Sequence, residues 1–105
     1  MQLVWNLKNP ARPRDCVRID RRTPFGNPFV IGKHGDRTAV IAKYREWILD
    51  RVLDDPALRD AVAALAGRPL ACWCAPLACH GDVLAEIAPR VADYQRAHTM
   101  RGHCL

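Results

Sequence analysis

The stretch from Pro10 to Asp36 constrains the fold most strongly, because four prolines interrupt it and it is far longer than a simple turn. No helix can run through it, so most of the segment is expected to be loop. Within it, "CVRI" and "FVI" are the only runs suited to brief strands. A loop of this length in a small domain is usually functional or disordered, and its turn-forming residues and aromatic anchors favour an ordered, functional loop.

The segments on either side have clear periodicities. Alternation predicts a strand, and apolar side chains at spacings of three and four predict a helix. Asp36 and Asp55 are suited to cap two successive helices, and Pro56 to open the second. The expected elements are a strand in residues 1–9, helices in 37–53 and 56–66, a buried strand in 68–74 and a helix from 79 onward.

This order predicts a small α/β unit with a short, mainly parallel sheet, of the Rossmann-like three-layer type. A chain of 105 residues has room for one hydrophobic core. We expect a single domain over residues 1–88, followed by a C-terminal helical extension and loose tail over residues 89–105. Pro89 is expected to end or kink the preceding helix and to open the extension.

Positive charge is concentrated near the start of the chain. Residues 1–37 carry eight Lys and Arg against three Asp and Glu, while the whole chain has a net charge of +5. Such a surface suits a phosphate-bearing small ligand or nucleic acid, although a solubilising surface would have the same composition.

Residues 1–7 lack the charged start and apolar run of a secretory signal, and no stretch is long enough to span a membrane. We therefore expect a cytoplasmic protein with no membrane partner. Its five cysteines are then expected to be thiols, metal ligands or core residues and not a disulfide framework.

The motif "CHGD" offers a reactive site where the last helix begins. Cys79 would be a thiolate favoured by the helix dipole, His80 a general acid or base, and Asp82 the group that orients it. Gly81 would let a ligand approach the backbone closely. The same turn could hold an anion or phosphate without covalent chemistry.

Zinc is the alternative interpretation, with Cys72, Cys74, Cys79 and His80 as ligands. Their spacing argues against it, because common zinc sites separate paired ligands by two to four residues. Strand geometry puts Cys72 and Cys74 on one face and Trp73 on the other, and Cys72 could also serve only as a small buried hydrophobe.

The motif "GNPF" offers a second candidate site. Gly26 supplies the turn, and the Asn27 amide could read a base or ribose, or could form a structural Asx turn. The expected phosphate and ligand contacts around it are Arg21, Arg22, Lys33, His34, Arg37 and Cys74.

These motifs, "GNPF" and "CxCAPxxCHGD", resemble those of the family catalogued as domain of unknown function 4326, found in phages and actinobacteria. The resemblance covers about residues 16–88 and departs from the family pattern at Ala78, where a second proline is expected. It implies a small α/β domain, phage-encoded and acting in the bacterial host cell, and no established activity. Distant likeness to other small Rossmann-like families suggests a nucleotide-related ligand by analogy.

We therefore expect a pocket between the GNPF loop and the CHGD helix start. It would bind a nucleotide-derived ligand or a nucleic-acid element, with or without Cys and His chemistry. The alternative function is a zinc-stabilised interaction module that binds a host protein or DNA.

Overall fold

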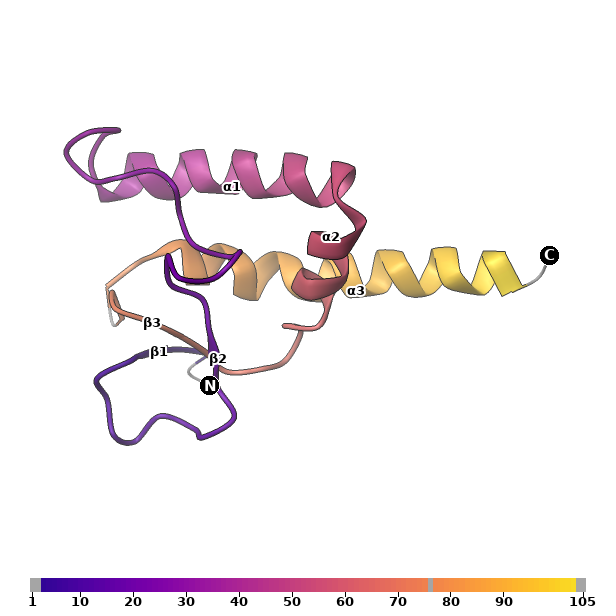
Figure 1. The fold of residues 1–105 in the computed structure, drawn as a ribbon, viewed down its shortest axis with the longest axis horizontal. Helices are drawn as coiled ribbons and strands as arrows, with labels where there is room; N and C mark the ends of the chain where they lie inside the picture. Colours follow the sequence, from indigo (N-terminus) through magenta and orange to yellow (C-terminus); the bar gives the residue numbers. More distant parts are fainter. Residues whose placement is uncertain (1–2, 76, 104–105) are drawn as a thin grey trace.

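The fold is seen in a computed structural model that describes residues 3–75 and 77–103 (Figure 1). Six elements follow one another along the chain, in an order that agrees with the sequence prediction. They are β1 (Val4–Asn6), β2 (Val17–Arg18), α1 (Arg37–Asp54), α2 (Pro56–Ala63), β3 (Leu70–Cys72) and α3 (His80–His103).

The three strands form a parallel sheet in the order β1-β3-β2. Leu70 of the central strand is in register with Val4 on one side and Val17 on the other. All three residues of β3 are buried, which explains why this strand is continuously apolar. The predicted α/β class with a short parallel sheet is therefore confirmed.

The run "FVI" does not form the strand that its composition favours. The backbone N–H of Phe29 donates to Oδ1 of Asn27 at 2.9 Å, and that of Val30 donates to Nδ1 of His34 at 2.8 Å. Because side chains of the same loop use these N–H groups, they are not free to pair with a neighbouring strand.

The strand after Gly67 is shorter than predicted and ends at Cys72. The side-chain amide of Asn6 donates to the carbonyl oxygens of Trp73 at 3.0 Å and Ala75 at 2.9 Å, which turns the chain away from the sheet. Trp73 therefore lies outside the strand and is 51% exposed, so its predicted place within the buried strand of residues 68–74 is wrong.

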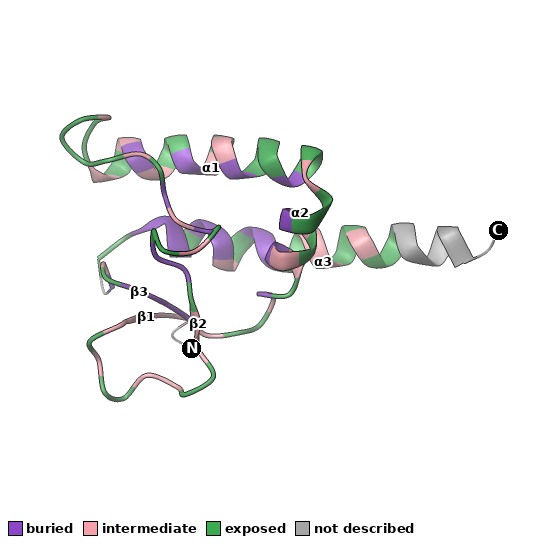
Figure 2. Ribbon diagram, viewed as in Figure 1, coloured by how far each residue is buried: buried purple, intermediate pink, exposed green. Residues whose placement is uncertain are grey.

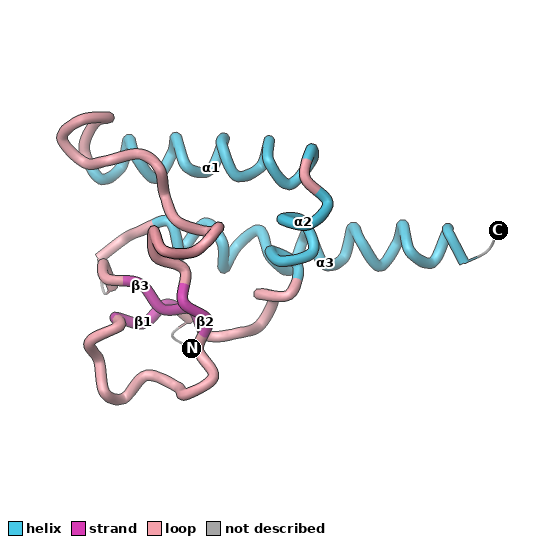
Figure 3. The backbone as a smooth tube through the Cα atoms, viewed as in Figure 1, coloured by secondary structure: helices cyan, strands magenta, loops and turns pink. Residues whose placement is uncertain are grey.

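Helix α3 packs against β1 and β3, while α1 and α2 pack on α3. Figure 3 shows the three strands together, with the helices on one side of them. Among the described residues, α3 is the one helix that contacts the sheet, so helices on both faces, as in a three-layer unit, are not seen.

Helix α1 has the predicted caps and core face. Oδ1 of Asp36 accepts the backbone N–H of Ala39 at 2.9 Å, as an N-cap does. Its buried residues recur at four-residue intervals, and they are coloured purple on α1 in Figure 2. They are Val40, Tyr44, Ile48 and Val52.

Helix α3 continues through Pro89 to His103. Its apolar face does not stop at the proline, because Ile87, Ala88 and Val91 all pack on the core. Residues 101–103, expected to belong to a loose tail, are helical, and residues 104–105 lie outside the described part. None of the described helices combines the length and apolar character needed to cross a bilayer.

Candidate functional site

The sequence "CHGD" forms a capped helix start. Cys79 precedes the first residue of α3 and takes the N-cap position, with its Sγ accepting the backbone N–H of Gly81 at 3.3 Å. Oδ2 of Asp82 returns to the backbone N–H of Cys79 at 3.1 Å. The return of the Asp82 side chain is one half of a capping box, whereas the Cys79 side chain caps the second helical residue, Gly81, and not Asp82. Asp82 therefore positions Cys79 and contributes to the helix cap.

Gly81 has a packing role at this helix start. A Cβ atom added there would lie 2.8 Å from Cδ1 of Ile19 and 3.0 Å from Cγ1 of Val4. Glycine therefore lets α3 approach the sheet closely. Gly81 itself is buried and does not line the cavity described below.

Cys72 and Cys79 face each other, with their sulfur atoms 3.1 Å apart. The chain between them folds Cys79 back over the end of β3, as the sequence suggested. The hydrogen bond with Cys79 lowers the pKa of the Cys72 thiol to about 6, although burial opposes this, and backbone N–H groups and the nearby His80 add to the effect. The same bond and burial raise the pKa of Cys79. The two shifts have opposite directions and favour the charged form at Cys72 and the protonated form at Cys79.

His80 is buried at the first position of α3. Its Nε2 lies 2.6 Å from the carbonyl oxygen of Ile19, and its ring meets the Tyr44 ring edge-on with centroids 5.1 Å apart. A carbonyl oxygen only accepts, so Nε2 carries a hydrogen and donates to Ile19. Nδ1 makes no hydrogen bond with the part of the chain that the structure describes.

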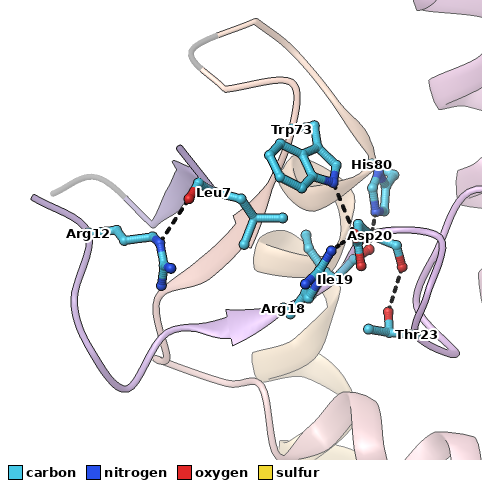
Figure 4. A network of polar contacts seen from close by, with 8 residues as sticks. All are labelled: Leu7, Arg12, Arg18, Ile19, Asp20, Thr23, Trp73 and His80. Carbon is cyan, nitrogen blue, oxygen red and sulfur yellow. Dashed lines mark hydrogen bonds and ion pairs between the residues drawn. The ribbon is translucent and has the colours of Figure 1, made fainter. Parts of the chain in front are cut away.

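Asp20 is a site residue that the sequence analysis missed. Its Oδ2 accepts hydrogen bonds from Arg18 at 2.7 Å and from the indole N–H of Trp73 at 3.0 Å (Figure 4). The Arg18 bond is the main reason why the pKa of Asp20 falls to about 2. Oδ1 is buried without a hydrogen bond of normal geometry to any described residue, although the nearby Arg22 backbone N–H helps to lower the pKa. The sequence feature that could have identified Asp20 as a site residue is its position directly after the strand-like run "CVRI".

The GNPF loop is held together by its own polar groups. Asn27 is buried, and its Nδ2 donates to the carbonyl oxygen of Val40 at 3.2 Å while its Oδ1 accepts from Phe29. Arg21 donates to the carbonyl oxygens of Asn27 at 3.1 Å and Phe29 at 3.3 Å. A Cβ atom on Gly26 would lie 2.5 Å from Cα of Arg21, so only glycine fits. The Asn27 amide therefore forms the Asx turn that was one of its two expected roles.

The two motifs meet across one cavity of about 400 Å³. Arg37 joins its two sides, because its guanidinium donates to the carbonyl oxygen of Ala78 at 2.9 Å. The lining includes eight of the predicted site residues: Arg21, Arg22, Asn27, Arg37, Cys72, Cys74, Cys79 and His80. Asp20, Phe29 and Trp73 line it as well.

Other predicted residues lie elsewhere. Lys33 and Asp82 are exposed and Gly26 is half-buried, and none of the three lines the cavity. Arg22, by contrast, is an exposed residue of the lining whose side chain makes no hydrogen bond or ion pair with residues 3–75 or 77–103. Among the cavity arginines it is the one with a guanidinium left for a ligand.

The four candidate zinc ligands are only partly assembled. Cys72 and Cys79 are in contact, but the Nε2 atom of His80 is occupied by the Ile19 carbonyl. Within the described ranges, no three His, Cys, Asp or Glu side chains are grouped in a way that could hold a metal ion.

The chain is similar in sequence to a known family and to a phage protein. The model of a family described as a domain of unknown function (DUF4326) matches residues 5–90. An uncharacterized 12.4 kDa protein in the nrdA-td intergenic region of Enterobacteria phage T4 is 34% identical over 76 residues, which are 71% of this chain and 68% of the phage protein. No solved structure matches the chain significantly. Both motifs and every residue of the cavity lie within residues 5–90, the range that the family model matches. The chain thus belongs to the DUF4326 family.

Proposed function

We propose that this domain binds a small, phosphate-bearing ligand of the nucleotide class in the cavity between the GNPF loop and the CHGD helix start. The observation that carries the proposal is that both motifs line one cavity, beside an arginine side chain that no described residue engages. The likeness to a phage T4 protein fits an action inside an infected bacterial cell.

The position and size of the cavity support a small ligand. Asp20 follows β2, and Cys74 follows β3, so the cavity lies at the carboxyl ends of parallel strands, where α/β proteins bind their ligands. We regard the domain as a reduced Rossmann-like unit on this ground. Ligand pockets typically enclose about 300–1,000 Å³, so a cavity of about 400 Å³ can take a mononucleotide-sized molecule.

The lining offers distinct contacts for the parts of such a ligand. Arg22 would bind phosphate, since a guanidinium matches the geometry of phosphate oxygens. Oδ1 of Asp20 would accept a hydrogen bond from a hydroxyl or a base N–H group. Phe29 and Trp73 give aromatic surface for a base. Asn27 would act by holding the loop in place, because its amide is engaged with Val40 and Phe29.

Burial favours a free nucleotide over a nucleic-acid chain. Asp20, Asn27, Cys72, Cys79 and His80 are all buried, so their polar atoms reach only a group that enters the cavity. A duplex presents its phosphates on a broad surface and would instead contact the exposed arginines. Binding of nucleic acid is therefore an alternative that the following test can detect.

Binding of nucleotides to the full chain, measured by calorimetry, tests the proposal. We expect at least one nucleoside phosphate to bind, the matching nucleoside to bind more weakly, and Arg22→Ala to weaken binding at least tenfold, since a charge-assisted hydrogen bond contributes about 1.5–3 kcal/mol. Arg14→Ala is the control, because Arg14 is equally exposed and lies outside this cavity.

Two results would contradict the proposal. One is a panel of nucleotides in which none binds. The other is binding of oligonucleotides alone, weakened equally by Arg22→Ala and Arg14→Ala, which would indicate a charged surface acting without the cavity.

A further inference from the structure

We propose that Cys72 and Cys79 form a peroxide-sensitive dithiol centre, in which Cys72 is oxidised first and Cys79 then closes a disulfide. The inference rests on two sulfur atoms 3.1 Å apart that both line the cavity. It goes beyond the proposed ligand binding and does not depend on it.

Both thiols are held by the fold in a position to react with each other. Cys72 ends the central strand β3, and Cys79 is fixed as the N-cap of α3 by Asp82. Both are free thiols. A disulfide bond is about 2.05 Å long, so closure requires the sulfurs to approach by about 1 Å. The scaffold thus needs only a small adjustment to form the bond.

The arrangement gives the two sulfurs different roles. The contact between the two sulfurs and the backbone N–H groups of Cys74 and Ala75 favour the charged form of Cys72, whereas the same contact and burial favour the protonated form of Cys79. The thiolate is the form of cysteine that attacks an oxidant. Cys72 is therefore the attacking sulfur, whereas the sequence alone pointed to Cys79.

The cavity limits the kind of oxidant that can react. Cys72 is 1% exposed and Cys79 is 4% exposed, so bulky disulfides and protein thiols are kept away. Hydrogen peroxide is close to water in size and can enter a cavity of about 400 Å³. A small hydroperoxide is thus the class of oxidant that this site admits.

The chemistry balances in two steps. The Cys72 thiolate attacks one peroxide oxygen, the O–O bond breaks, and Cys72 becomes a sulfenic acid while the departing hydroxide takes up a proton to form water. The Cys79 sulfur then attacks the Cys72 sulfur, the S–O bond breaks, and the hydroxyl leaves with the Cys79 proton as a second water. Two thiols and one peroxide give one disulfide and two waters.

The test uses the full chain, reduced, freed of reductant and treated with an equimolar amount of hydrogen peroxide. After remaining thiols are alkylated, peptide mass spectrometry should find a Cys72–Cys79 disulfide that dithiothreitol reverses. In Cys79→Ser the resolving thiol is absent, and dimedone should trap a sulfenic acid on Cys72. Serine is itself a good N-cap, so this variant keeps the helix start.

Cys16→Ser is the matched control, because Cys16 is a half-buried thiol that does not line the cavity and contacts Arg12. It should form the Cys72–Cys79 disulfide at the rate of the unmodified chain. Oxidation at Cys16 or Cys74 while Cys72 and Cys79 stay reduced would overturn the proposal. Trapping of the sulfenic acid on Cys79 of the unmodified chain, and not on Cys72, would overturn the assignment of roles.

Discussion

The indole N–H of Trp73 lies 3.0 Å from Oδ2 of Asp20, which ties the chain after β3 to the chain after β2. Arg18 donates to the same oxygen at 2.7 Å, and its guanidinium lies 5.8 Å from the centre of the Trp73 ring. Figure 4 shows this three-residue cluster, of which Asp20 and Trp73 line the cavity. The cluster keeps a buried carboxylate ionised in the wall of the cavity that the thiol pair also lines.

The ionised state of Asp20 predicts a loss of stability in acid. Its pKa is about 2 in the folded chain, below the ordinary value of 3.8, so its stabilisation is complete above pH 4 and is lost as pH falls through about 2. Melting temperatures measured between pH 2 and pH 5 should therefore fall more steeply for the unmodified chain than for Asp20→Asn. Asp15→Asn, at an exposed position, should follow the unmodified chain, and parallel curves for all three would contradict the assignment.

Asn27 is expected to stabilise the protein even without ligand. Asn27→Ala removes the bonds to the Val40 carbonyl and the Phe29 N–H inside a buried site. Leaving such groups unpaired costs about 1–3 kcal/mol each, so the free energy of unfolding measured in urea should fall by about that amount or more. Pro28→Ala, at an exposed neighbouring position, is the comparison. Equal stability of both variants would contradict this structural role and favour the other expected role of the Asn27 amide, contact with a base or ribose.

Gly26→Ala tests the close packing of the GNPF loop. The new Cβ atom would lie 2.5 Å from Cα of Arg21 and 2.9 Å from the carbonyl oxygen of Asp20, and both of these are backbone atoms. Overpacking of this kind costs about 1–3 kcal/mol, and the displaced segment carries Arg21 and Asp20 at the cavity. Urea denaturation should show the loss, and proton NMR should show shifts at the Trp73 indole. An unchanged spectrum would mean that the loop accommodates the new Cβ atom without displacing the segment that carries Arg21 and Asp20.

Much of this architecture could be predicted from local sequence. Asp36, Asp55 and Pro56 are sufficient to place the starts of α1 and α2, because capping depends on neighbouring residues. The return of Cys79 over the end of β3 follows from the short connection between them. These features need no knowledge of distant contacts.

The remaining features depend on contacts between distant parts of the chain. The strand ends at Cys72 because Asn6, far away in sequence, binds the carbonyls that follow it. Trp73 donates to Asp20, which is distant in sequence, and α3 passes Pro89 because its apolar face continues on the core. No local pattern reports such pairings, so the sequence prediction kept Trp73 within the buried strand and did not single out Asp20.

The thiol pair predicts a titration near neutral pH. The groups that act on Cys72 are the Cys79 thiol, His80, and the N–H groups of Cys74 and Ala75, and together they lower its pKa to about 6. The ultraviolet absorbance of thiolate should therefore rise between pH 5 and pH 7 in the unmodified chain and not in Cys72→Ser. In Cys79→Ser the hydroxyl can still donate a hydrogen bond, whereas Cys79→Ala removes the donor and should move the titration to higher pH. A single titration above pH 8 in the unmodified chain would contradict the pairing.

Metal analysis distinguishes a free Cys72–Cys79 dithiol from a zinc site at the same residues. A zinc site would need at least a third ligand beside Cys72 and Cys79, and the described residues bring no such group to them. Reduced protein, purified without chelator, should therefore keep its far-ultraviolet circular dichroism and its melting temperature in EDTA. Because structural zinc contributes directly to folding, stoichiometric zinc together with unfolding on chelation would replace the free dithiol by a metal site. That result would also remove the thiolate titration, since a zinc-bound sulfur stays deprotonated over the same pH range.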